Sequence, residues 1–119
     1  MKYKRMTAVL LAFCCLTACK NTKIDDEVYN YSESVIRAVD AYLDNQISYD
    51  EAKNKVSGML DQFDIWRDQH PDNDNSATNT LLRAYISSID YDLYREHSGI
   101  GTYADLLDER NKLAEEIGY

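Results

Sequence analysis

Residues 39–52, VDAYLDNQISYDEA, hold the end of one apolar helical pattern, a short break and the start of a second pattern. Within them, Ser48-Tyr49-Asp50-Glu51 matches a capping box, in which Ser48 accepts from a backbone N–H and the Glu51 side chain reaches back to the backbone. Ile47 and Ala52 are spaced as a hydrophobic staple. Because a short break favours antiparallel neighbours, this stretch predicts a helical hairpin.

The helices on either side of this break carry apolar residues at steps of three and four. The first is expected over about residues 25–46, and its apolar residues cover an arc of roughly 160°, wide enough to contact two neighbouring helices. The second is expected to continue until Pro71 ends it. The inward residues are Val28, Tyr31, Val35, Val39 and Tyr42 in the first helix, and Ala52, Val56, Met59, Leu60, Phe63 and Trp66 in the second.

The second half of the chain repeats this order of features. A third helix is expected to begin at Ser76 or Thr78 and to end before Gly99. Thr102 and Asp105 then form a box-like cap in front of a last helix. Each half therefore predicts a helix, a break and a capped helix.

The predicted fold is all-α: a small up-down antiparallel bundle of four helices, made of two helical hairpins. It occupies residues 25–119 as a single domain, which is long enough to bury a core of its own.

The expected domain is strongly acidic. The chain has 21 Asp and Glu against 13 Lys and Arg, and Lys2, Lys4 and Arg5 all precede residue 19. Without these three, the formal net charge of −8 becomes −11. Affinity for nucleic acid comes mostly from clustered Lys and Arg, which release counterions from the phosphates. The composition therefore excludes nucleic acid as a partner.

Residues 1–18 have the features of a signal peptide. The three basic residues precede an apolar run, AVLLAFCCL, at residues 8–16. As a helix this run spans about 14 Å, which is too short to cross a bilayer. A positive start followed by a short apolar run is typical of a segment that directs export.

The next residues, Leu16-Thr17-Ala18-Cys19, resemble the lipobox of bacterial lipoprotein precursors. The resemblance implies cleavage before Cys19 and attachment of a diacylglyceryl group to its thiol, so that residues 19–24 become a lipidated cysteine and a short tether. Two or more acyl chains anchor a protein stably. We therefore expect an exported protein, held by lipid at the bacterial cell membrane or the outer membrane. The alternative is an ordinary secretory signal with a cysteine near the cut.

Side chains for catalysis or metal binding are scarce in the expected domain. All three cysteines lie at or before position 19, which excludes disulfides, thiolate catalysis and Cys-ligated metals after it. His70 and His97 have no recognisable catalytic partners in the sequence. We therefore predict no cofactor and no metal.

The stretch Asp72-Asn73-Asp74-Asn75-Ser76 begins like a calcium-binding loop. However, Ala77 and Arg83 stand where an EF-hand needs Gly and Glu. A turn built by Asn and Asp side chains is the favoured interpretation, and weak binding of a hard cation is the alternative.

An acidic ridge on the second helix is one candidate partner surface. Asp61, Asp64 and Asp68 recur at steps of three and four, on the face turned away from Val56 and Phe63. Like charges at this spacing cost a few tenths of a kcal/mol per pair, unless a cation or a basic partner meets them. A solvated helix face is the favoured interpretation, and a basic partner or cation is the alternative.

Aromatic residues provide the other candidate surface. Tyr91 and Tyr94 fall outside the apolar stripe of the third helix, and Trp66 lies at the edge of its own stripe. Exposed tyrosines suit a contact with a protein or a glycan, because they offer area at a small entropy cost. Packing beneath the Gly99–Gly101 break is the favoured interpretation for the tyrosines, and the partner contact is the alternative.

Arg110 and Glu96 lie near the apolar stripes of the last two helices, where a charge needs a partner. We expect a structural ion pair of Arg110 with Glu96 or Asp92 across the second hairpin. Extension of the Arg110 head group into water is the alternative.

Together these features predict a non-catalytic binding module of the cell envelope, of the accessory, exclusion or immunity type, with another envelope protein as its partner. A small envelope enzyme, acting on peptidoglycan or lipid through a carboxylate pair, is the alternative. A purely structural spacer is a third possibility.

Overall fold

The computed structural model describes residues 24–119, which form four helices: α2 (Asp26–Leu43), α3 (Tyr49–Gln69), α4 (Ser76–His97) and α5 (Tyr103–Ile117). The predicted signal peptide, Cys19 and the tether up to residue 23 lie outside the described residues. Over residues 24–119 there is no strand, and the all-α prediction is confirmed.

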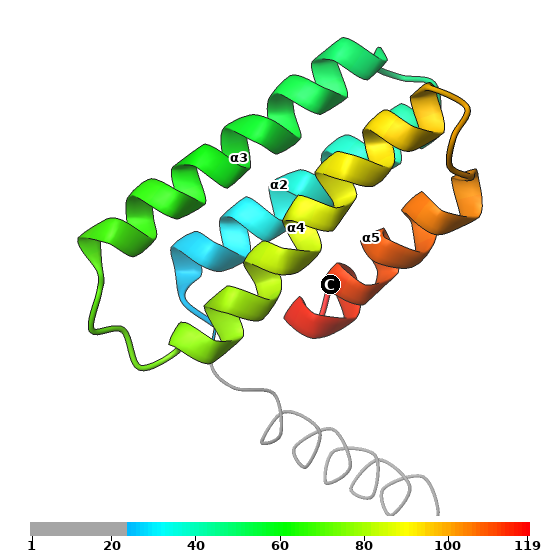
Figure 1. Ribbon diagram of the computed structural model, residues 1–119. Helices are drawn as coiled ribbons and strands as arrows, with labels where there is room; N and C mark the ends of the chain where they lie inside the picture. Colours follow the sequence, from blue (N-terminus) through cyan, green and yellow to red (C-terminus); the bar gives the residue numbers. More distant parts are fainter. Residues whose placement is uncertain (1–23) are drawn as a thin grey trace, which may run out of the picture.

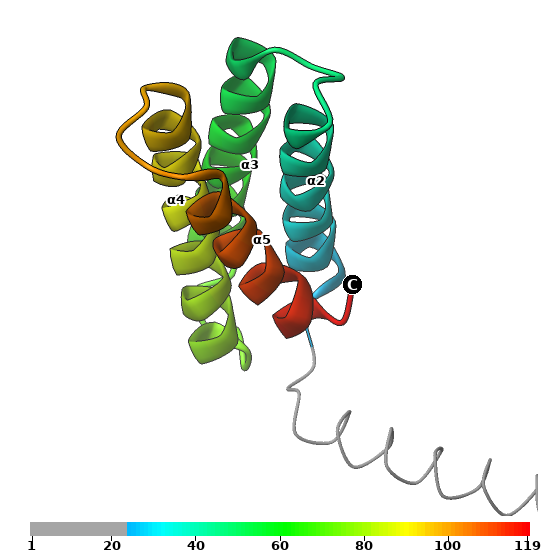
Figure 2. The same ribbon diagram turned by 90° about the vertical axis from the view of Figure 1, so that its right-hand side faces the viewer.

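The helices run alternately up and down, so that each is antiparallel to the next (Figure 1). α2 contacts all three other helices, and α4 does the same, whereas α3 and α5 do not contact each other. Figure 2 shows the shorter α5 crossing in front of α2 and α4, with α3 on the other side of this pair. The predicted four-helix bundle is thus confirmed, with α2 and α4 as its central pair.

The core is built from the apolar stripes that the sequence predicts. α2 and α4 bury aliphatic residues along their whole length, which fits their central position. Burial of one such side chain stabilises the fold by about 1.5–3 kcal/mol. The largest fully buried side chains are Phe63, Ile36, Leu82, Ile86, Ile89, Leu93, Leu106, Leu113, Val28, Val35, Val39 and Val56.

The α2–α3 connection differs in one detail from its prediction. α2 ends at Leu43 and not near Gln46, because Asn45 adopts a left-handed conformation with φ of 59°. Its N–H donates to the Tyr42 carbonyl and the Gln46 N–H donates to the Ala41 carbonyl, which closes the helix as a Schellman motif. The predicted start of α3 is confirmed, since the Ser48 hydroxyl accepts from the Glu51 N–H at 3.2 Å.

No helix within residues 24–119 has both the length and the apolar composition needed to cross a bilayer.

Candidate functional site

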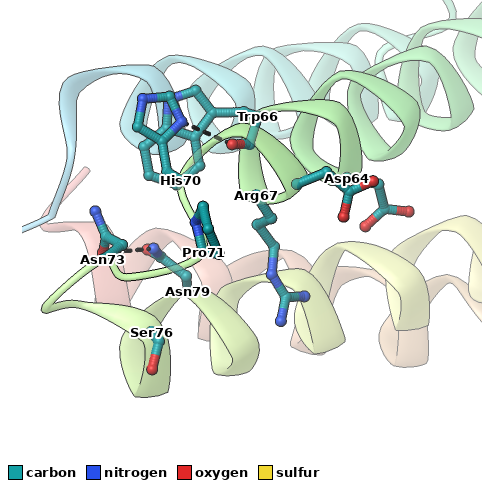
Figure 3. A pocket seen from close by; sticks show the side chains of 9 residues that line it. Asp64, Trp66, Arg67, His70, Pro71, Asn73, Ser76 and Asn79 are labelled. Atoms are coloured by element: carbon teal, nitrogen blue, oxygen red, sulfur yellow. Dashed lines mark hydrogen bonds between the residues drawn. The ribbon is translucent and has the colours of Figure 1, made fainter.

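A cavity of about 460 Å³ lies at the end of the bundle where the chain passes from α3 to α4. Figure 3 shows the side chains that line it. They come from the last turns of α3, the connecting loop and the first turns of α4: Asp64, Trp66, Arg67, Asp68, His70, Pro71, Asn73, Ser76 and Asn79. The lining is mainly polar, and its hydrogen bonds decide what it offers to a ligand.

The two aromatic groups of this cavity are engaged with each other. The His70 ring stacks on Trp66 with a centroid distance of 4.4 Å, and His70 Nδ1 lies 2.7 Å from the Trp66 carbonyl oxygen. The Trp66 side chain packs into the core and is only 7 % exposed. Trp66, a candidate for the partner surface, is therefore placed as a core residue covered by His70.

The three aspartates of the predicted acidic ridge do not share one environment. Asp61 and Asp68 are exposed, but Asp64 turns toward α4 and accepts two hydrogen bonds from the Arg83 guanidinium, at 2.6 and 3.0 Å. These bonds hold the pKa of Asp64 below its ordinary value. The ridge is thus reduced to Asp61 and Asp68, because the rotation of α3 places Asp64 at the contact with α4.

The connecting loop is bound to the rest of the fold through amide side chains. Asn73 Oδ1 accepts from the Asn75 N–H at 2.7 Å, as in a turn built by an Asn side chain, and also from Asn79 Nδ2 at 3.2 Å. Asn79 Nδ2 lies 3.5 Å from Asp25 Oδ2, so the loop and α4 are tied to the start of α2. Asp72 and Asp74 point to solvent, and among the described residues no three His, Cys, Asp or Glu side chains gather as metal ligands.

Arg110 makes a different ion pair from the predicted one. Its guanidinium donates from Nε and Nη2 to the two carboxylate oxygens of Asp40 on α2, both at 2.8 Å. Glu96 instead accepts from the Tyr42 hydroxyl, and Asp92 lies beside Arg95 in its own helix. The expected bridge within the second hairpin is therefore wrong; α5 packs against α2, and Asp40 lies at that contact.

The outer side of α4 differs from the surface of the other three helices. Its charged residues face neighbouring groups: Arg83 meets Asp64, Asp90 meets Lys53 and Glu96 meets Tyr42. The α4 residues that are exposed most fully include no Asp, Glu, Lys or Arg, whereas α2, α3 and α5 all expose such residues. Arg83 at the edge of this side and Arg95 at its end keep side chains that are 36 % and 32 % exposed. We call this surface the uncharged α4 face; its residues are Ala77, Thr80, Leu81, Ala84, Ser87, Ser88, Tyr91 and Tyr94.

Two predicted site residues dominate the uncharged α4 face. Tyr91 is 61 % exposed and Tyr94 is 45 % exposed, and their ring centroids are 6.4 Å apart. The Arg95 guanidinium lies 5.8 Å from the Tyr91 ring centroid and helps to fix its position. The two tyrosines therefore form an exposed pair, and the favoured interpretation of packing beneath the glycine break is wrong.

The absence of charge over the rest of this face was not among the predicted features. The signal was present in the sequence, because Ala77, Leu81, Ala84, Ser88 and Tyr91 follow one another at helical steps. This series lies on the side of the helix opposite the apolar stripe, so the periodicity that identifies the core does not point to it.

Both histidines of the described residues stack on aromatic rings near the ends of the bundle. His97 is exposed and stacks on Tyr49 with a centroid distance of 3.9 Å, and His70 stacks on Trp66. Of the two carboxylates at the cavity, Asp64 is held ionised by Arg83 and so does not suit a general acid.

Comparisons with protein-family models, with curated proteins and with solved structures found no match to this chain.

Proposed function

We propose that this chain is a lipid-anchored binding module of the bacterial envelope, which contacts another protein molecule through the uncharged α4 face. The observation that carries the proposal is the exposed pair of Tyr91 and Tyr94 on a helix side whose most exposed residues carry no formal charge. The anchor rests on the resemblance of residues 16–19 to a lipobox.

The physical argument concerns the cost of removing water from a surface. Charged residues are depleted at the centres of protein interfaces, and aromatic residues are enriched there, because ions lose more hydration than they regain. The described domain is acidic, yet the most exposed residues of this helix side are Ala, Ser, Thr, Leu and Tyr, and Arg95 at its end is paired with Asp92. Tyrosine also contributes contact area with few rotatable bonds. A partner can therefore cover this surface without burying an unpaired charge.

The exposed aspartates offer a weaker surface. Asp61 and Asp68 flank Ile65 on α3, and a partner there has to desolvate both carboxylates or supply cations for them. Ile65 is 52 % exposed, which makes it a control of similar exposure in a charged setting.

Photo-crosslinking in the cells that produce the full chain tests the proposal. A photoreactive aromatic residue is placed at position 91 in one variant and at position 65 in another. We expect a discrete covalent product at position 91 that is absent at position 65. Equal products, or no product at position 91, contradict the proposed surface. In the same cells, a Cys19→Ser chain is expected to leave the membrane fraction, and its retention there contradicts the lipid anchor.

A further inference from the structure

The central stripe of the uncharged α4 face has a symmetric order of residues. Ala77, Leu81, Ala84, Ser88 and Tyr91 follow at steps of four, three, four and three, and Arg95 continues the series. If a second α4 lies antiparallel, with a two-fold axis passing between positions 84 and 88, Ala84 meets Ser88 and Leu81 meets Tyr91 of the partner copy. Such self-pairing is the requirement for an isologous dimer interface.

The sizes of the side chains suit this antiparallel pairing. The small residues Ala84 and Ser88 meet at the axis, where they allow two helices to approach closely. Tyr91 of each copy lies over Leu81 of the other, and Leu81 is 39 % exposed in the single chain. Because of the two-fold symmetry, this contact forms twice, so that Tyr91 and Leu81 of both copies are covered.

Charge complementarity selects the same orientation. α4 follows the exposed acids Asp72 and Asp74, and its last turn carries Arg95, whose side chain is 32 % exposed, while Glu96 in the same turn accepts from Tyr42. Antiparallel pairing brings Arg95 of one copy toward the acidic loop of the other, at both ends of the contact. A parallel pair brings acid to acid and base to base, which is unfavourable.

When two copies approach each other, their acidic surfaces repel, and this repulsion is weaker between two uncharged α4 faces than between other faces. Residues 24–119 contain all 21 acidic residues but only eight of the 13 basic ones. Faces of the same sign oppose each other's approach, and this repulsion is smallest where a face has no charge. The uncharged α4 face is such a surface.

From these observations we infer that the partner of the uncharged α4 face is a second copy of this chain, bound antiparallel along α4. The inference rests on the proposed function and specifies the partner. The assembly is a two-fold dimer in the envelope, with Ala84 and Ser88 at its centre and Tyr91 over Leu81 on either side.

Site-directed crosslinking tests the inference in the full chain, produced in its native membrane. Because residues 24–119 contain no cysteine, one Ser→Cys substitution adds a single thiol to the domain. Ser88→Cys places it beside the axis, and Ser34→Cys places it on the exposed side of α2. With a short bismaleimide, we expect a covalent dimer of this chain for Ser88→Cys and only background for Ser34→Cys. Equal dimer yields for the two variants, or none for Ser88→Cys, overturn the inference.

A second substitution shows whether the dimer depends on the predicted contact. Tyr91→Asp in the Ser88→Cys chain places a charge against Leu81 of the other copy, so the dimer is expected to be lost. Ile65→Asp in the same background is expected to leave it unchanged. Persistence of the dimer with Tyr91→Asp contradicts the antiparallel arrangement.

The two proposals fail in different ways. A product at position 91 that contains only a different protein overturns the second copy and leaves the proposed function standing. The absence of any product at position 91 overturns both.

Discussion

The contact between Tyr42 and Glu96 joins the two central helices at the level of single residues. The Tyr42 hydroxyl on α2 donates to the Glu96 carboxylate on α4. Burial, the hydrogen bond to Glu96 and the negative charge of Glu96 together raise the pKa of Tyr42 from 10.0 to about 12. The phenol is therefore held in its neutral form, as the donor that this contact needs.

This raised pKa predicts a loss of stability at alkaline pH. The folded chain holds the Tyr42 proton more tightly than the unfolded chain, whose tyrosine has a pKa of 10.0. The contribution is fully present below pH 10 and is lost as the pH rises from 10 to about 12. Urea unfolding at a series of pH values measures it. The advantage of the native chain over Tyr42→Phe is expected to shrink across this window, and a constant difference contradicts the prediction. The exposed Tyr91→Phe is the control.

Single-residue contacts between helices were the least predictable feature from sequence. Periodicity identifies the inner side of a helix; it placed Arg110 near that side, but it placed Asp64 on the opposite face, whereas Asp64 is half-buried against α4. Periodicity does not say which neighbour lies beside each flank. Asp64 therefore met Arg83, and Arg110 met Asp40 and not Glu96. Tyr91 and Tyr94 lie off the apolar stripe, but this position left open both exposure and packing beneath the Gly99–Gly101 break, and only the structure shows that they are exposed.

The connection from α4 to α5 depends on two glycines for different reasons. Gly99 has a φ of 74°, and it ends α4 while the Ile100 N–H donates to the Arg95 carbonyl at 2.9 Å. Gly101 instead passes so close to α4 that an added Cβ would lie 2.9 Å from the Arg95 Cβ. Gly99 therefore adopts the left-handed conformation that ends α4, and Gly101 leaves space for the Arg95 side chain.

Two glycine substitutions are predicted to act in opposite directions. Gly101→Ala is expected to lower the free energy of unfolding by about 1–3 kcal/mol, because the new methyl group clashes with Arg95. Gly58→Ala lies within α3, where a Cβ meets nothing within 4 Å. It is expected to raise the free energy of unfolding by about 0.5–1 kcal/mol, through helix propensity. Chemical denaturation measures both changes, and effects of the same sign contradict this account.

Helix limits were largely predictable because they depend on local chemistry. Thr102 and Asp105 form the expected capping box, with side-chain to backbone hydrogen bonds of 3.1 and 3.4 Å. At α3 only part of the predicted box forms, since the Glu51 carboxylate accepts from the Ser48 hydroxyl and not from its backbone N–H. The left-handed Asn45 was missed, because Asn is tolerated both within a helix and after its end.

At the scale of the whole molecule, the short connections predict the antiparallel order of the helices. They do not predict that two helices are central and two flank them. Sequential antiparallel helices were predicted, and a square bundle would give each of them two neighbours. α2 and α4 also contact each other across the bundle, and α3 and α5 flank them. The wide apolar arc of α2 indicates that this helix has more than one neighbour. The ion pair of Asp40 with Arg110 shows where α5 packs against α2.

The Asp40–Arg110 pair joins the first described helix to the last, so breaking it tests how the bundle is closed. Both carboxylate oxygens are engaged, and the Arg110 side chain is only 20 % exposed. Asp40→Asn leaves a partly buried cation without its counter-charge, and the free energy of unfolding is expected to fall by about 1–2 kcal/mol. Glu33→Gln is the matched control on α2, because its partner Arg37 lies in the same helix and is 69 % exposed.

The control substitution is expected to cost about 0.5 kcal/mol or less, since an exposed pair within one helix stabilises weakly. Coupling between Asp40→Asn and Arg110→Gln, measured in a double-mutant cycle by urea unfolding, separates the ion pair from other contacts of Arg110, such as the Tyr119 ring 5.7 Å away. Additive effects of the two substitutions, or a loss for Asp40→Asn no larger than that for Glu33→Gln, mean that apolar packing alone holds α5 against α2. Strong coupling means that this contact fixes the last helix on the bundle.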